Sequence, residues 1–428
     1  MKKQLKNSIK ALVILPFAIL GIAWICMFPA LSPSFLLGIG FLLFGIAISC
    51  LIGGKLTNIA LLFSSLMFGY LVGEGVSYAI DPYVNASGFN KKSTKFDPIR
   101  GYRWLGDSIR GFRTRMGVVV YDNHFYPNNE GWIMNQDYTY KKKDSTRFRW
   151  MILGDSFVAG IMLQTNLPNR TQQLLNDSLG VGKIEIYSFG VDGGGIMNWY
   201  NVFFKEILPN YEFDGIIIAP YADNLYRDFM VMMIDTNGFM GRIDSVEWSE
   251  GDSPKMSDFK ELKPYTNVYS DIEIEHFLSH PLKPFDWPLR KQLKSQINNW
   301  GRKGKNNTAE NIKTIDQLQD KMGSIKFTQL DSIISWCQSN QKQLVLASIP
   351  SKEELKNNWL GERNQHKVEM DIIAKEYQLE YLDGYAVFKD LNEVEIDSRW
   401  LKYDGHWNQK GSDEYATELA NYLISIKQ

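Results

Sequence analysis

The chain of 428 residues divides into an apolar N-terminal region and a longer region of mixed polarity. Residues 11–31, 32–54 and 56–80 are three largely apolar stretches, each long enough to cross about 30 Å of hydrocarbon as a helix. A signal peptide would have a single apolar stretch of about 7–15 residues before a polar mature chain. None of the three stretches has the polar stripe at helical spacing that a helix of a soluble core shows. The pattern therefore predicts a region of three transmembrane helices over residues 1–80.

The basic residues of this region predict its orientation. Lysines precede the first stretch and separate the second from the third, at Lys2, Lys3, Lys6, Lys10 and Lys55. The turn between the first two stretches carries no charge. Because Lys and Arg are enriched on the cytoplasmic side of membrane proteins, both lysine-bearing ends are expected in the cytoplasm. Three crossings then place the chain after residue 80 outside the cytoplasm.

From residue 147 onward, short apolar runs alternate with helical patterns. The apolar runs end in turn residues and lie within 147–156, 183–195, 214–224 and 342–351. Helical patterns lie at 169–180, 329–341 and 362–378. Continuous apolar runs of this length are typical of buried parallel strands, and their alternation with helices predicts an α/β domain over 147–427. Residues 81–146 are expected to connect the two regions, and the polar segment 225–328 to form a mostly helical insertion.

Composition excludes several classes of function. The 47 basic and 48 acidic residues give a net charge of −1, so the sequence offers no basic face for a nucleic acid. The three cysteines, Cys26, Cys50 and Cys337, are too few and too scattered for a disulfide framework or a zinc site. Neither a metal nor an organic cofactor is expected.

Small and polar residues follow three of the predicted strands. These clusters are Gly154–Ser156, Gly190–Gly195 and Asp223-Asn224. Open α/β sheets bind ligands outside the carboxyl ends of their strands, so the three clusters are expected to meet at one edge. Serine hydrolysis needs a nucleophile and donors to an oxyanion, and this edge offers the Ser156 hydroxyl with flexible glycine backbone and an amide nearby. Taken alone, a Gly-Asp-Ser tripeptide or an Asn after a strand is also common in ordinary turns.

His406 is the candidate base among the five histidines of the chain. It lies in a Gly-containing turn before an amphipathic C-terminal helix, and Asp404 precedes it by two residues. A carboxylate beside an imidazole can orient it and stabilise its protonated form. The other four histidines lie in polar segments and are expected to be surface or structural residues. The alternative is a surface histidine in a loop that enters a helix.

The order of these blocks resembles the SGNH (GDSL-type) hydrolase family. The resemblance covers roughly 147–427 and implies that Ser156 is the nucleophile and that His406 and Asp404 complete the catalytic set. It also implies an oxyanion hole made by the backbone N–H groups of Ser156 and Gly193 and the side chain of Asn224.

The chain departs from the family pattern in three places. Ser188 stands where the glycine block usually begins with Asn, and Leu225 follows Asn224 where the family usually has a second polar residue. The acid usually lies three residues before the histidine, at the place of Tyr403, whereas Asp404 lies two before it. An Asp-x-His arrangement occurs in relatives that act on acetyl groups of exopolysaccharides, so Asp404 is kept as the expected acid.

The resemblance implies a three-layer, flavodoxin-like α/β domain behind the transmembrane region. The apolar stretches and their lysines predict a multi-pass membrane protein whose domain after residue 80 faces outward. The resemblance adds that the membrane is the bacterial cytoplasmic membrane and that this domain cleaves small acyl esters, with O-acetyl groups of cell-surface carbohydrate as the expected substrate. Its partners would be this acyl ester and the lipid bilayer. Two alternatives stay open: an O-acyltransferase that modifies a surface polysaccharide, and a non-catalytic glycan-binding or assembly protein on a hydrolase-like fold.

Overall fold

The computed structural model describes residues 86–115, 118–233, 239–243, 263–264, 267–279, 312–356 and 365–427. All of them belong to one compact unit, Ala86–Pro281 with Pro288–Gln428. The three predicted transmembrane stretches lie outside the described residues. Among the helices within those residues, none combines the length and the apolar character that a bilayer-spanning helix needs.

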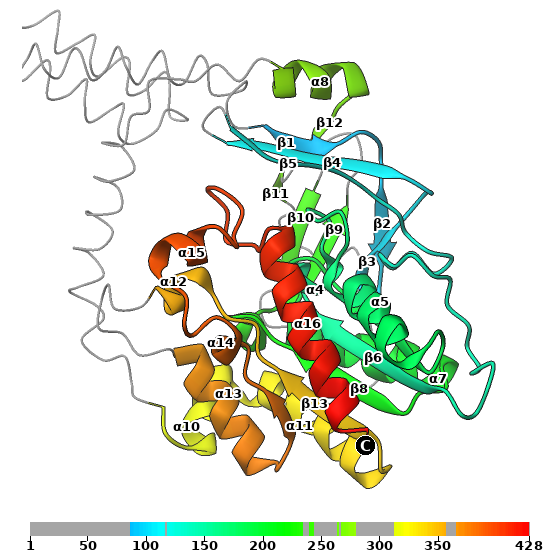
Figure 1. Cartoon of the computed structure of the whole chain (residues 1–428), viewed down its shortest axis with the longest axis vertical. Coiled ribbons are helices and arrows are strands. Elements are labelled where there is room, and N and C mark those ends of the chain that lie inside the picture. The colour runs from blue at the N-terminus through cyan, green and yellow to red at the C-terminus, as the bar shows by residue number, and fades with distance from the viewer. Residues whose placement is uncertain are drawn as a thin grey trace, which may run out of the picture. The chain divides into compact units, whose positions relative to one another are not determined.

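A five-stranded parallel sheet forms the centre of the described unit (Figure 1). Its strands in chain order are β6 Phe148–Gly154, β7 Ile184–Gly190, β8 Gly215–Ala219, β13 Gln343–Ala347 and β14 Glu380–Leu382. They lie side by side in the order β14-β13-β8-β6-β7, and every neighbouring pair is parallel. The first strand thus lies between the second and the third, which is the order of flavodoxin-like doubly wound sheets. The predicted α/β class with a parallel sheet is confirmed.

Both faces of this sheet are buried, because successive strand residues point to opposite sides. Along β6, Met151 and Leu153 pack into one apolar cluster and Trp150 and Ile152 into the other. The first cluster includes residues of helices α6 Ile196–Val202, α10 Ile315–Met322, α11 Ser324–Ser339 and α13 Gln365–Glu376. The second includes residues of α4 Ser156–Ala159, α5 Leu167–Leu179 and α16 Gln409–Ser425. The domain therefore has three layers.

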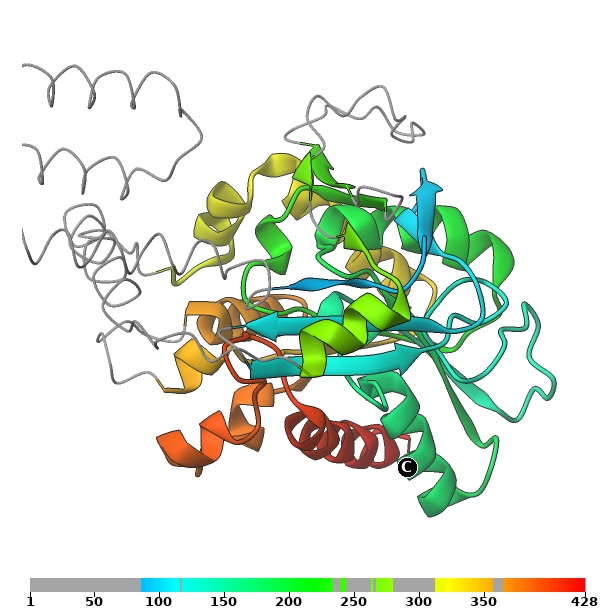
Figure 2. The ribbon, with the colours of Figure 1, turned by 90° about the horizontal axis from the view of Figure 1, so that it is seen from above.

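A second sheet shares no strand pairing with the parallel one, and three of its four strands precede the parallel sheet in the sequence. It consists of β12 Asn267–Val268, β1 Ser87–Phe89, β4 Ile109–Arg115 and β5 Val118–Phe125, in that order. Helix α8 Asp271–Ser279 covers one face, as the view from above shows (Figure 2), and there the rings of Phe112 and Phe277 stack at 5.8 Å. A hairpin of β2 Thr94–Asp97 and β3 Gly101–Trp104 follows β1 in the chain.

Two predicted segments contain elements that the sequence did not reveal. The described part of the connection 81–146 forms the five strands β1 to β5. Within 225–328, the described residues include β9 Phe229–Met233, β10 Phe239–Ile243 and β11 Lys263–Pro264 as well as helices α8 and α10. Large parts of this insertion lie outside the described residues, so its mostly helical character stays a prediction.

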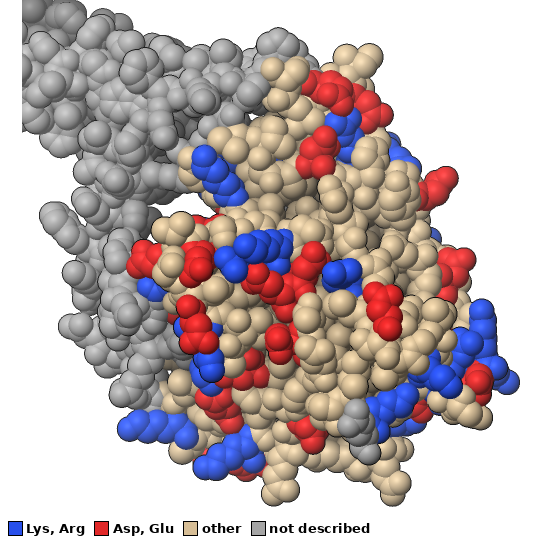
Figure 3. Space-filling view, viewed as in Figure 1, with Lys and Arg blue, Asp and Glu red and all other residues tan. Residues whose placement is uncertain are grey.

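Charged side chains are interspersed on the face that Figure 3 shows. Lys and Arg lie beside Asp and Glu over the described part of this face, and neither sign forms a continuous patch. This distribution agrees with the nearly balanced composition of the chain.

Candidate active site

The turn Gly154–Phe157, called the nucleophile turn after the predicted role of Ser156, joins strand β6 to helix α4. Glycine is required at its start, because a Cβ on Gly154 would lie 2.1 Å from Cγ2 of Val158. A Cβ on Gly190, at the end of the neighbouring strand β7, would lie 2.4 Å from the backbone nitrogen of Ala159. The two glycines therefore let α4 approach the strand ends closely. Ser156 becomes the first residue of α4, with its hydroxyl beyond the carboxyl edge of the sheet.

Asp155 anchors this turn from inside the protein. Its side chain is fully buried, and Oδ1 caps the helix by accepting the Phe157 N–H at 3.0 Å. Oδ2 accepts hydrogen bonds from Asn224 Nδ2 at 2.9 Å and from Arg227 Nη1 at 3.0 Å. Arg227 was not singled out from the sequence, since nothing local links it to a residue 72 positions away. With both oxygens occupied, Asp155 holds the turn in place.

Ser156, His406 and Asp404 form a continuous chain of hydrogen bonds. Ser156 Oγ lies 2.7 Å from His406 Nε2, and His406 Nδ1 lies 2.5 Å from Asp404 Oδ1. An ionised Asp404 can only accept, so Nδ1 carries the proton and Nε2 is left to accept from the serine hydroxyl. Ser156 is 5% exposed and the His406 side chain 27% exposed, so this row of hydrogen bonds reaches from the interior to the solvent boundary. The structure thus brings together the three residues whose catalytic roles the sequence predicted.

The loop 400–407 holds the imidazole and its acid in one tight turn. Its ends pair as an antiparallel bridge between Trp400 and Trp407, and the Leu401 N–H donates to the His406 carbonyl at 2.9 Å. Tyr403 has φ of +62°, a left-handed conformation that bends the chain just before Asp404. The carboxylate then accepts from both the backbone N–H and the ring of His406. This bend explains how an acid only two residues before the histidine reaches its ring.

Electrostatics favour an ionised Asp404 and a basic His406. Burial alone would raise the pKa of Asp404, but the hydrogen bonds and charge of His406, together with the charge of Arg113, hold that pKa well below its usual range. Burial alone would lower the pKa of His406, but the hydrogen bond and charge of Asp404 outweigh it and raise that pKa above its usual value. The carboxylates of Asp192 and Asp155 act in the same direction. The imidazole is therefore suited to accept a proton from the serine.

Asp192 is a further acidic group beside the site. It lies in the glycine loop between Val191 and Gly193, and its backbone N–H donates to the Tyr102 hydroxyl at 2.7 Å. Burial raises the pKa of its carboxyl, and the charge of His406 partly opposes this. The sequence showed Asp192 only as part of the glycine block, because its proximity to the imidazole depends on how the loops fold together.

The three predicted oxyanion donors differ in the hydrogen bonds that they already make. Within the described part of the chain, the backbone N–H groups of Ser156 and Gly193 have no hydrogen-bond acceptor. Gly193 has φ of +73°, which glycine adopts readily. Asn224 is fully buried, with one amide N–H bond to Asp155 at 2.9 Å and a longer one to the Gly194 carbonyl at 3.3 Å. The two backbone donors are open and the longer amide bond is the weaker one, while the oxyanion role of all three stays a prediction.

His366 and Cys337 are two further titratable residues, and neither belongs to this hydrogen-bonded chain. His366 is buried, and its Nε2 lies 3.1 Å from the carbonyl of Pro220, the residue that follows β8. Cys337 is buried without a disulfide partner. Across the described ranges, no group of three or more His, Cys, Asp or Glu side chains could hold a metal ion.

Comparison with known proteins yields structural similarity only. No family model matches the chain, and no curated protein matches it in sequence. Similar solved structures include a protein described as a GDSL-like lipase from Parabacteroides merdae, which is 11% identical, with coverage of 66% of this chain and 98% of that one and a TM-score of 0.36. An acetyl xylan esterase is 12% identical, with coverage of 65% and 99% and a TM-score of 0.34. A lipase/acylhydrolase from Enterococcus faecalis is 9% identical, with coverage of 65% and 96% and a TM-score of 0.32.

These structures are of the kind that the sequence blocks resemble. Their low identities and their TM-scores below 0.5 carry no argument about the activity or substrate of this chain. The fold assignment rests on the order and direction of its own strands, and the functional argument on its own side chains.

Proposed function

We propose that this chain is a serine hydrolase of the SGNH (GDSL) type that cleaves small acyl esters. The hydrogen-bonded chain from Ser156 through His406 to Asp404 is the observation that carries the proposal. A serine hydroxyl is a weak nucleophile by itself, and an adjacent base with an orienting carboxylate is the arrangement that activates it. The open N–H groups of Ser156 and Gly193 support it further, since acyl transfer needs donors for the developing oxyanion.

The first half of the reaction forms an acyl-enzyme. Ser156 Oγ attacks the ester carbonyl carbon while its proton passes to His406 Nε2, and Asp404 stabilises the resulting imidazolium. The carbonyl oxygen becomes an oxyanion that accepts from the N–H groups of Ser156 and Gly193. The tetrahedral intermediate then breaks its bond to the alcohol oxygen, which takes the proton from His406 and leaves.

The second half releases the acid. A water molecule attacks the acyl carbon and gives its proton to His406, and a second oxyanion is held by the same donors. The bond to Ser156 Oγ breaks, the serine recovers its proton from His406, and the carboxylic acid departs. Ester and water have then become alcohol and acid, and the enzyme is unchanged.

The substrate we propose is an O-acetyl ester on a cell-surface carbohydrate. A small acyl group suits a nucleophile whose residue is only 5% exposed, because a bulky acyl chain would need more room beside Ser156. The carbohydrate follows from the resemblance of the Asp-x-His arrangement and from the proposed location outside the cytoplasm.

Labelling with a fluorophosphonate tests the chemistry without knowledge of the substrate. Mass spectrometry of the treated full-length protein should find the adduct on the peptide that contains Ser156. A panel of esters, from short-chain aryl esters to acetylated oligosaccharides, should then show turnover of the short acyl groups. Transfer of the acyl group to an added sugar in place of water would turn the proposal into an acyltransferase, and an adduct on another serine would overturn it.

We propose that residues 1–80 anchor the enzyme in the cytoplasmic membrane of a bacterium, with the α/β domain outside. The support is the sequence of three apolar stretches and the lysines before the first and after the second. A reporter that is active only outside the cytoplasm, fused after Gln428, should be active. Activity of a cytoplasm-only reporter at the same place would reverse the orientation.

A further inference from the structure

Strand β4 of the second sheet points two arginines at the loop that carries the proposed base and acid. Residues 113 and 115 lie on the same face of β4 because strand side chains alternate with a period of two. Arg113 Nη1 donates to Asp404 Oδ2 at 2.6 Å, and Arg115 Nη1 donates to the Tyr403 carbonyl at 2.6 Å. The other face of β4 points away toward α8, where Arg110 pairs with Asp122 and Glu275.

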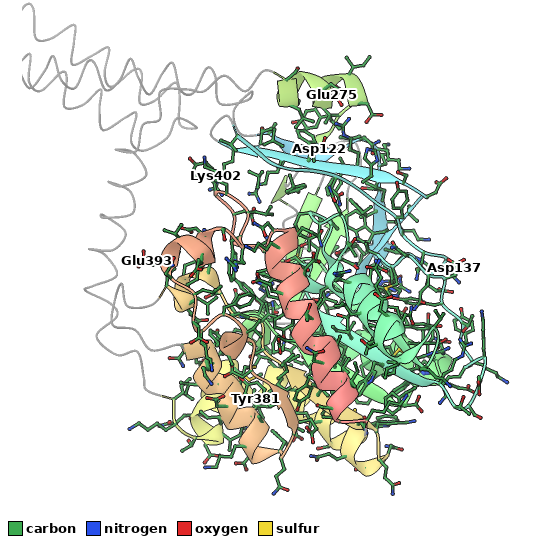
Figure 4. The ribbon with its side chains drawn as sticks, viewed as in Figure 1. Asp122, Asp137, Glu275, Tyr381, Glu393 and Lys402 are labelled. Atoms are coloured by element: carbon green, nitrogen blue, oxygen red, sulfur yellow. The ribbon has the colours of Figure 1, made fainter. Side chains whose placement is uncertain are left out.

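The sheet and the loop meet at the edge of the site. Figure 4 shows Lys402 on the loop between α15 Glu393–Asp397 and α16, which extends toward the sheet on which Asp122 is labelled. Arg113 is 37% exposed and the Asp404 side chain only 5% exposed, so the guanidinium lies over a carboxylate that is otherwise enclosed. Arg115 binds the carbonyl of the left-handed Tyr403, the residue whose bend turns Asp404 toward the imidazole.

The two oxygens of Asp404 therefore have separate partners. Oδ1 accepts from the ring and the backbone N–H of His406, and Oδ2 accepts from Arg113. A carboxylate held at both oxygens has a fixed plane, whereas one held at a single oxygen can rotate about its Cβ–Cγ bond. The guanidinium also offsets part of the negative charge that the imidazole senses.

We propose that Arg113 is a positioning residue for the ester cleavage, an inference that rests on the proposed function. It fixes the plane of the Asp404 carboxylate and, by its charge, offsets part of the negative charge that favours a protonated His406.

The charges around His406 explain why the positive charge of Arg113 matters. Acidic groups face the imidazole from three segments: Asp404 from its own loop, Asp192 from the glycine loop and Asp155 from the nucleophile turn. Arg227 binds Asp155 directly, and Arg113 binds Asp404. The net effect raises the pKa of His406, and a protonated imidazole cannot accept the proton of Ser156. Loss of the Arg113 charge would raise that pKa further and lower the fraction of His406 that is unprotonated at neutral pH.

Three substitutions separate the two contributions of Arg113. Arg113→Met removes the donor and the charge, Arg113→Gln keeps a donor without the charge, and Arg113→Lys keeps the charge. We expect the Met and Gln variants to raise the pKa of His406 by about half to one unit, and the Lys variant to stay near wild type. At pH 7, kcat/KM of the Met variant should fall by up to about three- to tenfold, mainly in kcat, since no substrate contact is lost.

NMR titration of full-length protein labelled at its histidine rings measures this pKa directly, and a His406→Gln variant assigns the resonance. Arg110→Met is the matched control, because it removes an ion-paired arginine from the same strand but from the opposite face. It should lower stability without shifting the resonance of His406. The Gln and Lys variants keep the test decisive where the Met variant fails to fold.

The outcomes distinguish this proposal from the one on which it rests. An unshifted pKa of His406 in both the Met and the Gln variant, or an equal shift in Arg110→Met, would leave Arg113 a merely structural residue. A shift as expected, in a protein whose Ser156→Ala variant hydrolyses esters as fast as wild type, would instead remove the proposed function. The NMR readout needs no substrate, so the two failures cannot be confused.

Discussion

The two halves of the site are held in different ways. The nucleophile half, Gly154–Phe157, is fixed from inside: the Asp155 side chain is fully buried, and its partners follow strands of the same parallel sheet. The base half, loop 400–407, lies at the solvent boundary with the His406 side chain 27% exposed. Its acid is held by Arg113, which belongs to a different sheet.

This difference matches what each half has to do in the proposed reaction. A nucleophile must be aimed at one point, and the close-packed strand ends give it a rigid support. A base must take up and release protons, so it needs contact with water, and there orientation depends on a few charged contacts. The nucleophile half should therefore tolerate changes in distant residues, whereas the base half should respond to the second sheet.

Removal of the proposed nucleophile should have the largest effect on activity among the changes that test this comparison. Ser156→Ala should lower kcat by about 10⁴-fold or more, because no acyl-enzyme can form. The fold should stay intact, since the Ser156 hydroxyl has only His406 as its partner among the described residues. Steady-state kinetics on a short-chain ester, with circular dichroism as the control, measure this. Retention of a tenth of the activity would contradict the assignment of Ser156.

Removal of the acid comes next in size. Asp404→Asn should lower kcat by about 10²- to 10⁴-fold, because the tautomer of His406 is no longer enforced and its cation loses a counter-charge. His406→Ala should cost at least as much, and the double variant little more than His406→Ala alone, because residues acting as a unit are not additive. A loss below about tenfold for Asp404→Asn would leave a Ser156–His406 dyad and remove Asp404 from the catalytic set.

The oxyanion role of Asn224 sharpens the comparison, since this residue both supports the nucleophile half and is expected to bind the transition state. Its weaker hydrogen bond, to the Gly194 carbonyl at 3.3 Å, is the one that an oxyanion could replace. Asn224→Ala should lower kcat by about 10²- to 10³-fold. It should also reduce the free energy of unfolding by about 1–3 kcal/mol, because Asp155 loses a buried donor. A loss of stability with nearly unchanged kcat would assign Asn224 to support alone, as denaturant unfolding alongside kinetics would reveal.

The pH dependence is the smallest effect and concerns the base half alone. Activity should rise with pH as His406 loses its proton, with a midpoint in kcat/KM above the ordinary histidine value of about 6.5, because three carboxylates stabilise the cation. Asp192→Asn should move this midpoint downward by less than about one unit, since one negative charge near the imidazole is removed. A pH profile of wild type and variant measures both. A wild-type midpoint at or below 6.5, or an upward shift in the variant, would contradict this electrostatic description.

The parallel sheet could be predicted from the sequence because its signals are local. Residues 150–153 and 215–219 are continuous runs without a polar side chain, which is typical of short strands buried on both faces. The short strand β14 gave no such signal, since only Leu382 of its three residues is buried. Strands β1 to β5 were missed for a similar reason: in β5, for example, only Val120, Asn123 and Phe125 of the eight residues are buried.

The candidate site shows the same division. Ser156 and the Asp404–His406 pair could be found because glycine turns, helix starts and an acid two residues from a histidine are visible along the chain. Asp155 as an anchor, Arg227, Asp192 and Arg113 could not, because their roles depend on contacts between separate loops. The departure in the Asp-x-His spacing became intelligible only with the left-handed φ of Tyr403.

The sequence by itself determined the alternation of strands and helices, the residues offered for nucleophile, base and acid, and the three apolar stretches of residues 1–80. These follow from periodicity and turn chemistry, which act over a few residues. Only the tertiary structure decided that Ser156 meets His406 across 250 residues of chain, and that Arg113 holds Asp404 across 291. Pairing over such separations depends on how two sheets and their loops pack together, and no local pattern encodes the distance between two side chains that meet only in the fold.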